Sequence, residues 1–76
     1  MNKLIILSVD DWQVLYVNGK EEYQHHEVQI GHISKFCPIE SIEEIWITGK
    51  LGEYIIDNGG FPNSLEKCVE IGYEVQ

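Results

Sequence analysis

The 76-residue chain contains no arginine and no alanine, and only five lysines stand against thirteen acidic residues, giving a formal net charge of −8 at pH 7. Proteins that bind nucleic acid neutralise its phosphates with clustered lysine and arginine, so this composition argues strongly against direct nucleic-acid binding. The same lack of positive charge disfavours attachment to an anionic membrane surface. An acidic surface does favour solubility and attraction to a basic partner.

Long apolar runs are also missing. The first run, residues 4–7, is shorter than the apolar core of a secretory signal peptide, which needs about 7–15 residues. It is soon followed by Asp10 and Asp11, with no small-residue cleavage site. No other segment approaches the ~20 apolar residues of a transmembrane helix. We therefore expect a cytoplasmic protein without a membrane-spanning segment.

Cysteine is scarce. Cys37 and Cys68 are far apart in the sequence, and two cysteines are too few for the disulfide framework of a small secreted domain. Both have apolar neighbours, so we expect both to be reduced and buried. A nucleophilic cysteine needs electropositive surroundings that lower its thiol pKa, and so acidic a chain does not offer them.

The residues that are present favour a small ordered domain. Hydrophobic residues make up 43% of the chain, more than a disordered segment carries, and we expect one compact domain over residues 1–76. Residues 3–9 and 13–17 have the apolar, partly β-branched character of strands. The dipeptide Asn18-Gly19 follows at once, and it is the strongest short signal for a type I′ hairpin turn.

A two-residue turn at Asn18-Gly19 determines which residues of the hairpin face each other. It places Val14 opposite Tyr23, so these two side chains are expected on one face of the sheet. It also places Asp11 opposite His26 at the open end of the hairpin.

The second half of the chain alternates between helical and strand patterns. Apolar residues recur at helical spacing over 30–37, ending before a proline, and again over 51–55. Residues 43–48 are strand formers, and a last helix is expected to start at Asn63 and to end at Gly72. The sequence thus predicts an α+β domain. It comprises a small antiparallel sheet of about four strands, the first three forming a meander, packed by two to three short helices.

Histidines and carboxylates are the candidates for metal binding or acid–base chemistry. His25 and His26 are adjacent on a strand, so their side chains point to opposite faces and cannot hold one ion together. Asp11, His26 and His32 are the metal-binding alternative, because a carboxylate beside an imidazole is a common fragment of such sites. No HxxE, HxH or CxxC spacing completes a coordination shell. The simpler interpretation is that Asp11 fixes the hairpin end through His26.

Tyrosines and glutamates are the candidates for contact with a partner. Tyrosine and tryptophan dominate binding hot spots when exposed, although they are also ordinary core residues. We expect both tryptophans to pack inside and several tyrosines to lie at the surface. The candidate partner-binding residues are Tyr16, Glu21, Glu43, Glu44, Tyr54 and Tyr73.

Three segments, DDWQVLYVNGK, YQHHEV and NGGFPNSLEKC, resemble small bacterial and phage proteins of uncharacterised function. Those proteins have an Asp-Trp turn, a Leu-Tyr-Val strand, an Asn/Asp-Gly hairpin and a late Phe-Pro-x-x-Leu helix start. His25 stands where they have a glycine. The resemblance implies a shared fold and a prokaryotic or phage origin, and it supplies no catalytic residues.

Two functions from different classes follow. The first is a small, acidic, non-enzymatic protein that engages another protein with a basic surface, with no cofactor. In its sharpest form it is a phage or mobile-element inhibitor or adaptor that targets a basic nucleic-acid-handling protein. The alternative is a metal- or small-ligand-binding domain that uses Asp11, His26 and nearby histidines. A homodimer formed through an exposed sheet edge is a third alternative, because so small a core gains stability by association.

Overall fold

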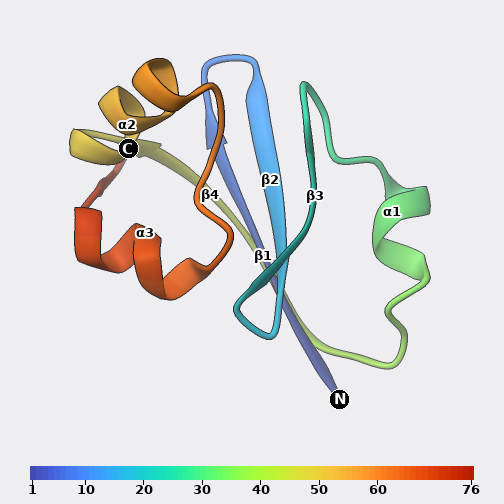
Figure 1. The fold of residues 1–76 in the computed structure, drawn as a ribbon. Coiled ribbons are helices and arrows are strands. Elements are labelled where there is room, and N and C mark those ends of the chain that lie inside the picture. Colours follow the sequence, from blue (N-terminus) through green and yellow to red (C-terminus); the bar gives the residue numbers. More distant parts are fainter.

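The computed structural model describes all 76 residues, which form a five-stranded sheet and three helices (Figure 1). The strands are β1 (Asn2–Val9), β2 (Trp12–Val17), β3 (Lys20–His25), β4 (Ile39–Thr48) and β5 (Glu74–Val75). Their order across the sheet is β3-β2-β1-β4-β5. The predicted α+β class and N-terminal meander are confirmed. The sheet is mixed rather than purely antiparallel, because β4 runs parallel to β1.

The helices lie on both faces of the sheet. α1 (Ile30–Ser34) belongs to the crossover from β3 to β4 and lies on one side, while α2 (Lys50–Asn58) and α3 (Leu65–Ile71) lie on the other (Figure 1). The Oγ of Ser64 accepts the N–H of Lys67 at 3.2 Å, so Ser64 caps α3 one residue after the predicted start. Gly72 ends that helix as predicted. None of the three helices is long and apolar enough to cross a membrane.

The hairpin turn forms at Asn18-Gly19, where both residues have positive φ, 53° and 86°. The predicted pairing beyond the turn is wrong, because β3 contains a bulge that adds Glu22 between the partners of Leu15 and Tyr16. Tyr23 therefore lies opposite Leu15 and not opposite Val14. One extra residue moves every later side chain of a strand to the other face.

Two apolar clusters cover the two faces of β1 and β2, which explains why these strands have few polar residues. The larger cluster lies under α2 and α3 and contains Leu7, Val14, Tyr16, Ile47, Leu51, Ile55, Phe61 and Cys68. The smaller cluster contains Leu4, Ile6, Leu15 and Val17. The α1 region, residues 28–39, packs against it through Val28, Ile33, Phe36 and Ile39. The side of the sheet under α1 is therefore covered mainly at β1, β2 and β3.

Tyr16 is a core residue. Its side chain is 0% exposed, and its hydroxyl donates to the backbone oxygen of Pro62 at 2.7 Å and lies 3.0 Å from Cys68 Sγ. Burial raises the pKa of both the Tyr16 phenol and the Cys68 thiol. The expectation that Tyr16 lies at the surface is wrong. Its side chain lies on the same face of β2 as Val14, and α2 and α3 cover that face. Both cysteines are free as expected, but Cys37 is exposed.

Candidate functional site

Asp11 and His26 do meet at the open end of the hairpin. His26 Nδ1 lies 3.1 Å from the backbone oxygen of Asp11 and 3.7 Å from its carboxylate, with both side chains largely exposed. The His26 ring packs edge-on against Trp12, with ring centroids 5.0 Å apart. These contacts lie at the hairpin end, where the simpler interpretation placed them, but the hydrogen-bond contact is with the Asp11 backbone oxygen and not with its carboxylate. An exposed pair of this kind contributes little to stability by charge alone.

His32 is engaged elsewhere. Its ring stacks on Tyr23, with centroids 3.8 Å apart, and its Nδ1 accepts the N–H of Gln29 at 3.2 Å. No group of three His, Cys, Asp or Glu side chains comes close enough together to hold a metal ion. The structure therefore does not bring Asp11, His26 and His32 together as a metal site.

A cleft of about 390 Å³ lies at the carboxyl ends of β1 and β4, beside the start of α2. This is the end of parallel strands at which α/β sheets commonly bind ligands. Its charged lining residues are Asp10, Asp11 and Glu53, and it contains neither histidine nor lysine. The cleft therefore extends the acidic surface of the molecule and suits a cation better than an anion.

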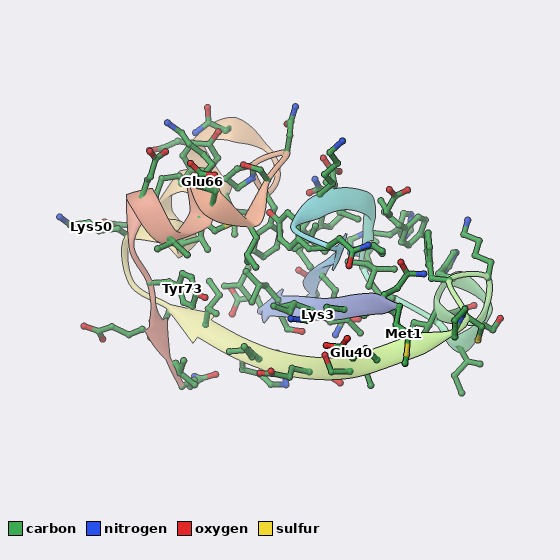
Figure 2. All side chains as sticks on the ribbon, turned by 90° about the horizontal axis from the view of Figure 1, so that it is seen from below. Met1, Lys3, Glu40, Lys50, Glu66 and Tyr73 are labelled. Carbon is green, nitrogen blue, oxygen red and sulfur yellow. The ribbon has the colours of Figure 1, made fainter.

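The second prominent surface is the outer edge of β4. This strand is ten residues long, yet β5 pairs only with Ile47 and Thr48. Residues 39–46 thus have no neighbouring strand on the side away from β1. Figure 2 shows β4 along the lower margin of the molecule, with β5 crossing only its end. We call residues 39–46 the open edge, whose outward backbone groups are free apart from the Trp46 carbonyl.

The backbone of the open edge has a definite polarity. The carbonyl of Trp46 accepts the N–H of Gln76 at 2.8 Å and therefore points away from β1. In a strand, the N–H and C=O of successive residues point to alternate sides, and no irregularity interrupts β4 between Ser41 and Trp46. The N–H and C=O of Ile42 and Glu44 consequently point outward too, while those of Glu43 point to β1.

The side chains of the open edge are acidic and apolar. Glu40, Glu43 and Glu44 are exposed, and Ile42 and Trp46 are 47% and 45% exposed. The nearest positive charge is Lys3, whose Nζ lies 3.5 Å from the Glu40 carboxylate (Figure 2).

Trp46 was expected inside, and this expectation is wrong. The register places Trp46 beside Ser8 and Ile42 beside Leu4, on the face that α1 covers. The α1 region packs against the cluster of Leu4 and Leu15 and does not extend over Trp46. Part of the indole is left in solvent as a result.

The other candidate partner-binding residues do not converge on one surface. Glu43 and Glu44 lie together on β4, whereas Glu21 is half-buried on β3, at the opposite edge of the sheet. Tyr54 and Tyr73 are half-buried against the larger core cluster. Glu40, Ile42 and Trp46 were missed as surface residues. Apolar residues at 39 and 42 in front of the predicted strand 43–48 were the available signal for a longer strand.

Comparisons with protein families, with curated proteins and with solved structures gave no match. The geometry and charge of this chain are therefore the basis for a proposed function.

Proposed function

We propose that this is a small, acidic, non-enzymatic binding protein that engages another protein with a basic surface. The observation that carries the proposal is the open edge of β4, where Glu40, Glu43 and Glu44 are exposed beside Ile42 and Trp46. Exposed aromatic and aliphatic side chains supply binding energy when a partner buries them. Surrounding carboxylates accelerate the encounter with a basic protein and select against acidic ones.

The sharpest form of the proposal is an inhibitor or adaptor that occupies the basic surface of a nucleic-acid-handling protein. The formal net charge of −8 and the absence of arginine support it. Such a surface attracts phosphates, and the exposed carboxylates of β4 compete for the same lysines and arginines. Screening by salt must then weaken the complex.

The test compares two triple variants that remove the same charge from different surfaces. One neutralises the open edge (Glu40→Gln, Glu43→Gln and Glu44→Gln), and the other neutralises exposed glutamates elsewhere (Glu22→Gln, Glu27→Gln and Glu70→Gln). Both are used, with the unmodified protein, to capture partners from a bacterial lysate. Bound proteins are eluted by salt up to roughly 0.5 M, where the Debye length is about 4 Å.

We expect basic proteins to be captured by the unmodified protein and by the second variant, and to be lost from the open-edge variant. Elution below 0.5 M salt is expected for the same partners. Equal loss from both variants would mean that only net charge matters. Capture that is insensitive to salt would contradict the proposal.

A further inference from the structure

We propose that the partner binds by adding an extended segment, as a sixth strand, to the open edge of β4. This inference rests on the proposed function and specifies how the same surface recognises its partner. The segment carries two adjacent basic residues flanked by apolar ones. Its backbone pairs with β4, and its side chains match the alternating chemistry of that strand.

The backbone of the open edge provides the first part of the match. The N–H and C=O groups of Ile42 and Glu44 point away from β1, and the C-terminal segment reaches only as far as Trp46, through Gln76. A row of unpaired backbone groups on a regular strand is a template for another strand. β4 is regular beyond its single irregularity opposite Asn2 and Lys3, so an incoming segment finds consecutive bonding positions.

The opposite edge of the sheet is not equivalent, which narrows the binding site to β4. Along β3, the N–H of Glu21 donates to the backbone oxygen of Asn63 at 2.8 Å, and Lys20 forms a bridge with Ser64. The side chain of Gln24 bonds both the N–H and the C=O of Phe61. The chain before α3 thus already occupies this edge.

The side chains of β4 define the sequence of the segment. Glu43 lies beside Ile5 and Glu44 beside Ile6, so the two carboxylates project on opposite faces of the sheet. Two neighbouring basic residues in an added strand also project on opposite faces, and each meets one carboxylate. Ile42 then lies opposite an apolar residue of the segment, and the partly exposed Trp46 side chain lies beside the end of the segment. Opposite charges and apolar pairs directly across strands are both favourable.

A second copy of the chain fits this edge poorly. Antiparallel self-pairing centred on Glu43 or on Glu44 places that glutamate opposite its own copy. Pairing centred on Ile42 places Glu40 opposite Glu44. Like charges directly opposite destabilise a strand pair, so in these three registers the carboxylates favour a basic segment over a dimer.

The experiment uses a synthetic peptide, acetyl-Thr-Val-Val-Lys-Lys-Val-Thr-amide, titrated into the ¹⁵N-labelled protein at low salt. We expect the backbone amides of Ile42 and Glu44 to become protected from hydrogen exchange. The same peptide with both lysines replaced by glutamate is the charge control, and we expect it to bind at least about tenfold more weakly. The peptide methylated on both lysine backbone nitrogens is the backbone control. It is expected not to bind, because one of its two amides must face β4.

Two protein variants separate backbone from charge. Glu44→Thr and Glu44→Pro both remove the carboxylate, but only proline removes the outward N–H, which β1 does not use. We expect Glu44→Pro to bind the peptide about tenfold more weakly than Glu44→Thr. Circular dichroism checks that both are folded, and the methylated peptide provides the backbone test if Glu44→Pro is not.

The outcomes distinguish the two proposals. If neutralising Glu40, Glu43 and Glu44 abolishes binding while the methylated peptide still binds, strand addition is wrong and the basic-partner proposal stands. If instead the neutralised variant binds the lysine peptide as tightly as the unmodified protein, the basic-partner proposal is wrong. Protection of amides outside β4 overturns strand addition. So does a dimer in light scattering that Glu44→Pro dissociates.

Discussion

The two edges of the sheet differ in whether their outward backbone groups are covered. β3 is bulged at Glu22 and is covered by the chain before α3, through Glu21 to Asn63 and Gln24 to Phe61. β4 is ten residues long and regular over most of its length, and only its last two residues are paired by β5. One edge is closed by hydrogen bonds, whereas the other is protected only by charge.

The difference shows what each edge is suited to do. A bulge and a covering loop prevent any further strand from joining β3. Glutamates on an exposed edge discourage pairing with another acidic edge, including a copy of the same chain, but they do not obstruct a basic strand. The closed edge therefore contributes to stability, and the open edge is available for recognition.

The largest effect is expected from proline on the two sides of β4. The N–H of Glu43 points to β1 and that of Glu44 points outward, so Glu43→Pro removes a bond of the sheet and Glu44→Pro does not. We expect Glu43→Pro to lower the free energy of unfolding by about 3 kcal/mol or more and Glu44→Pro by about 1 kcal/mol or less. Urea denaturation measures both. Equal losses would show that the outer side of β4 is not open.

Removing the side chain that closes the other edge is expected to cost about 2–4 kcal/mol. Gln24 Oε1 accepts from Trp12 Nε1 and from the Phe61 N–H, each at 2.9 Å, and Gln24 Nε2 bonds Glu21 and the Phe61 carbonyl. Gln24→Ala leaves these part-buried groups without partners. Ser41→Ala on the exposed β4 strand is the control and should change stability by less than about 0.5 kcal/mol. Similar values for the two variants would contradict the distinction between the edges.

Tyr16→Phe tests how the chain before α3, which covers the β3 edge, is held to the core. The variant leaves the buried Pro62 carbonyl without its donor and removes the contact with Cys68 Sγ. We expect a loss of about 1–3 kcal/mol in the free energy of unfolding. Thermal denaturation measures it, with an unchanged circular dichroism spectrum as the check on the fold. An unchanged free energy of unfolding would mean that the Tyr16–Pro62 hydrogen bond does not hold the chain before α3 in place.

The same pair of groups predicts weakening at high pH. Burial raises the folded-state pKa of the Tyr16 phenol and of the Cys68 thiol, so the folded protein keeps protons that the unfolded chain releases. The ordinary values are about 8.5 for cysteine and about 10 for tyrosine. Their contribution is therefore complete below about pH 8 and is lost as the pH rises above those values. For each group the loss is at most about 1.4 kcal/mol per pH unit, and it applies only between the pKa of the unfolded chain and that of the folded protein.

Urea midpoints measured from pH 6 to 11 check this dependence. Tyr16→Phe is expected to make the decline above pH 10 shallower, because only one of the two buried acids remains. Stability that increases between pH 9 and 11 would contradict the sign of the effect.

The smallest effect concerns the protection of the open edge. Neutralising Glu40, Glu43 and Glu44 together removes the repulsion that opposes self-pairing, at about 0.2–1 kcal/mol per opposed pair. We expect this variant to self-associate at lower concentration than the Glu22→Gln, Glu27→Gln and Glu70→Gln variant. Sedimentation velocity at matched concentrations measures the difference. Equal association would mean that charge does not protect the edge.

Local signals predicted much of the fold. Asn18-Gly19 needs positive φ at both positions, and Gly72 ends α3, so residue chemistry alone identified both. The bulge at Glu22 left no such signal, because it depends on how β3 fits against β2. The burial of Tyr16 was also hidden, since β2 is covered on both faces and its sequence does not alternate.

The candidate site was predicted only in part. Glu43 and Glu44 were identified from charge, but their grouping with Ile42 and Trp46 depends on the register of β4 against β1. The exposure of Trp46 depends on where α1 lies, and α1 is far from Trp46 in the sequence. These are long-range properties of the packed sheet, which composition and periodicity do not encode.

Amide hydrogen exchange along β4, with and without the lysine peptide, tests the central claim most directly. In the free protein we predict protection at Glu43 and Ile45, whose N–H groups face β1, and rapid exchange at Ile42 and Glu44. Addition of the peptide should then protect Ile42 and Glu44. Uniform protection of β4 in the free protein, or no new protection with the peptide at saturating concentration, would contradict an open edge that receives a basic strand.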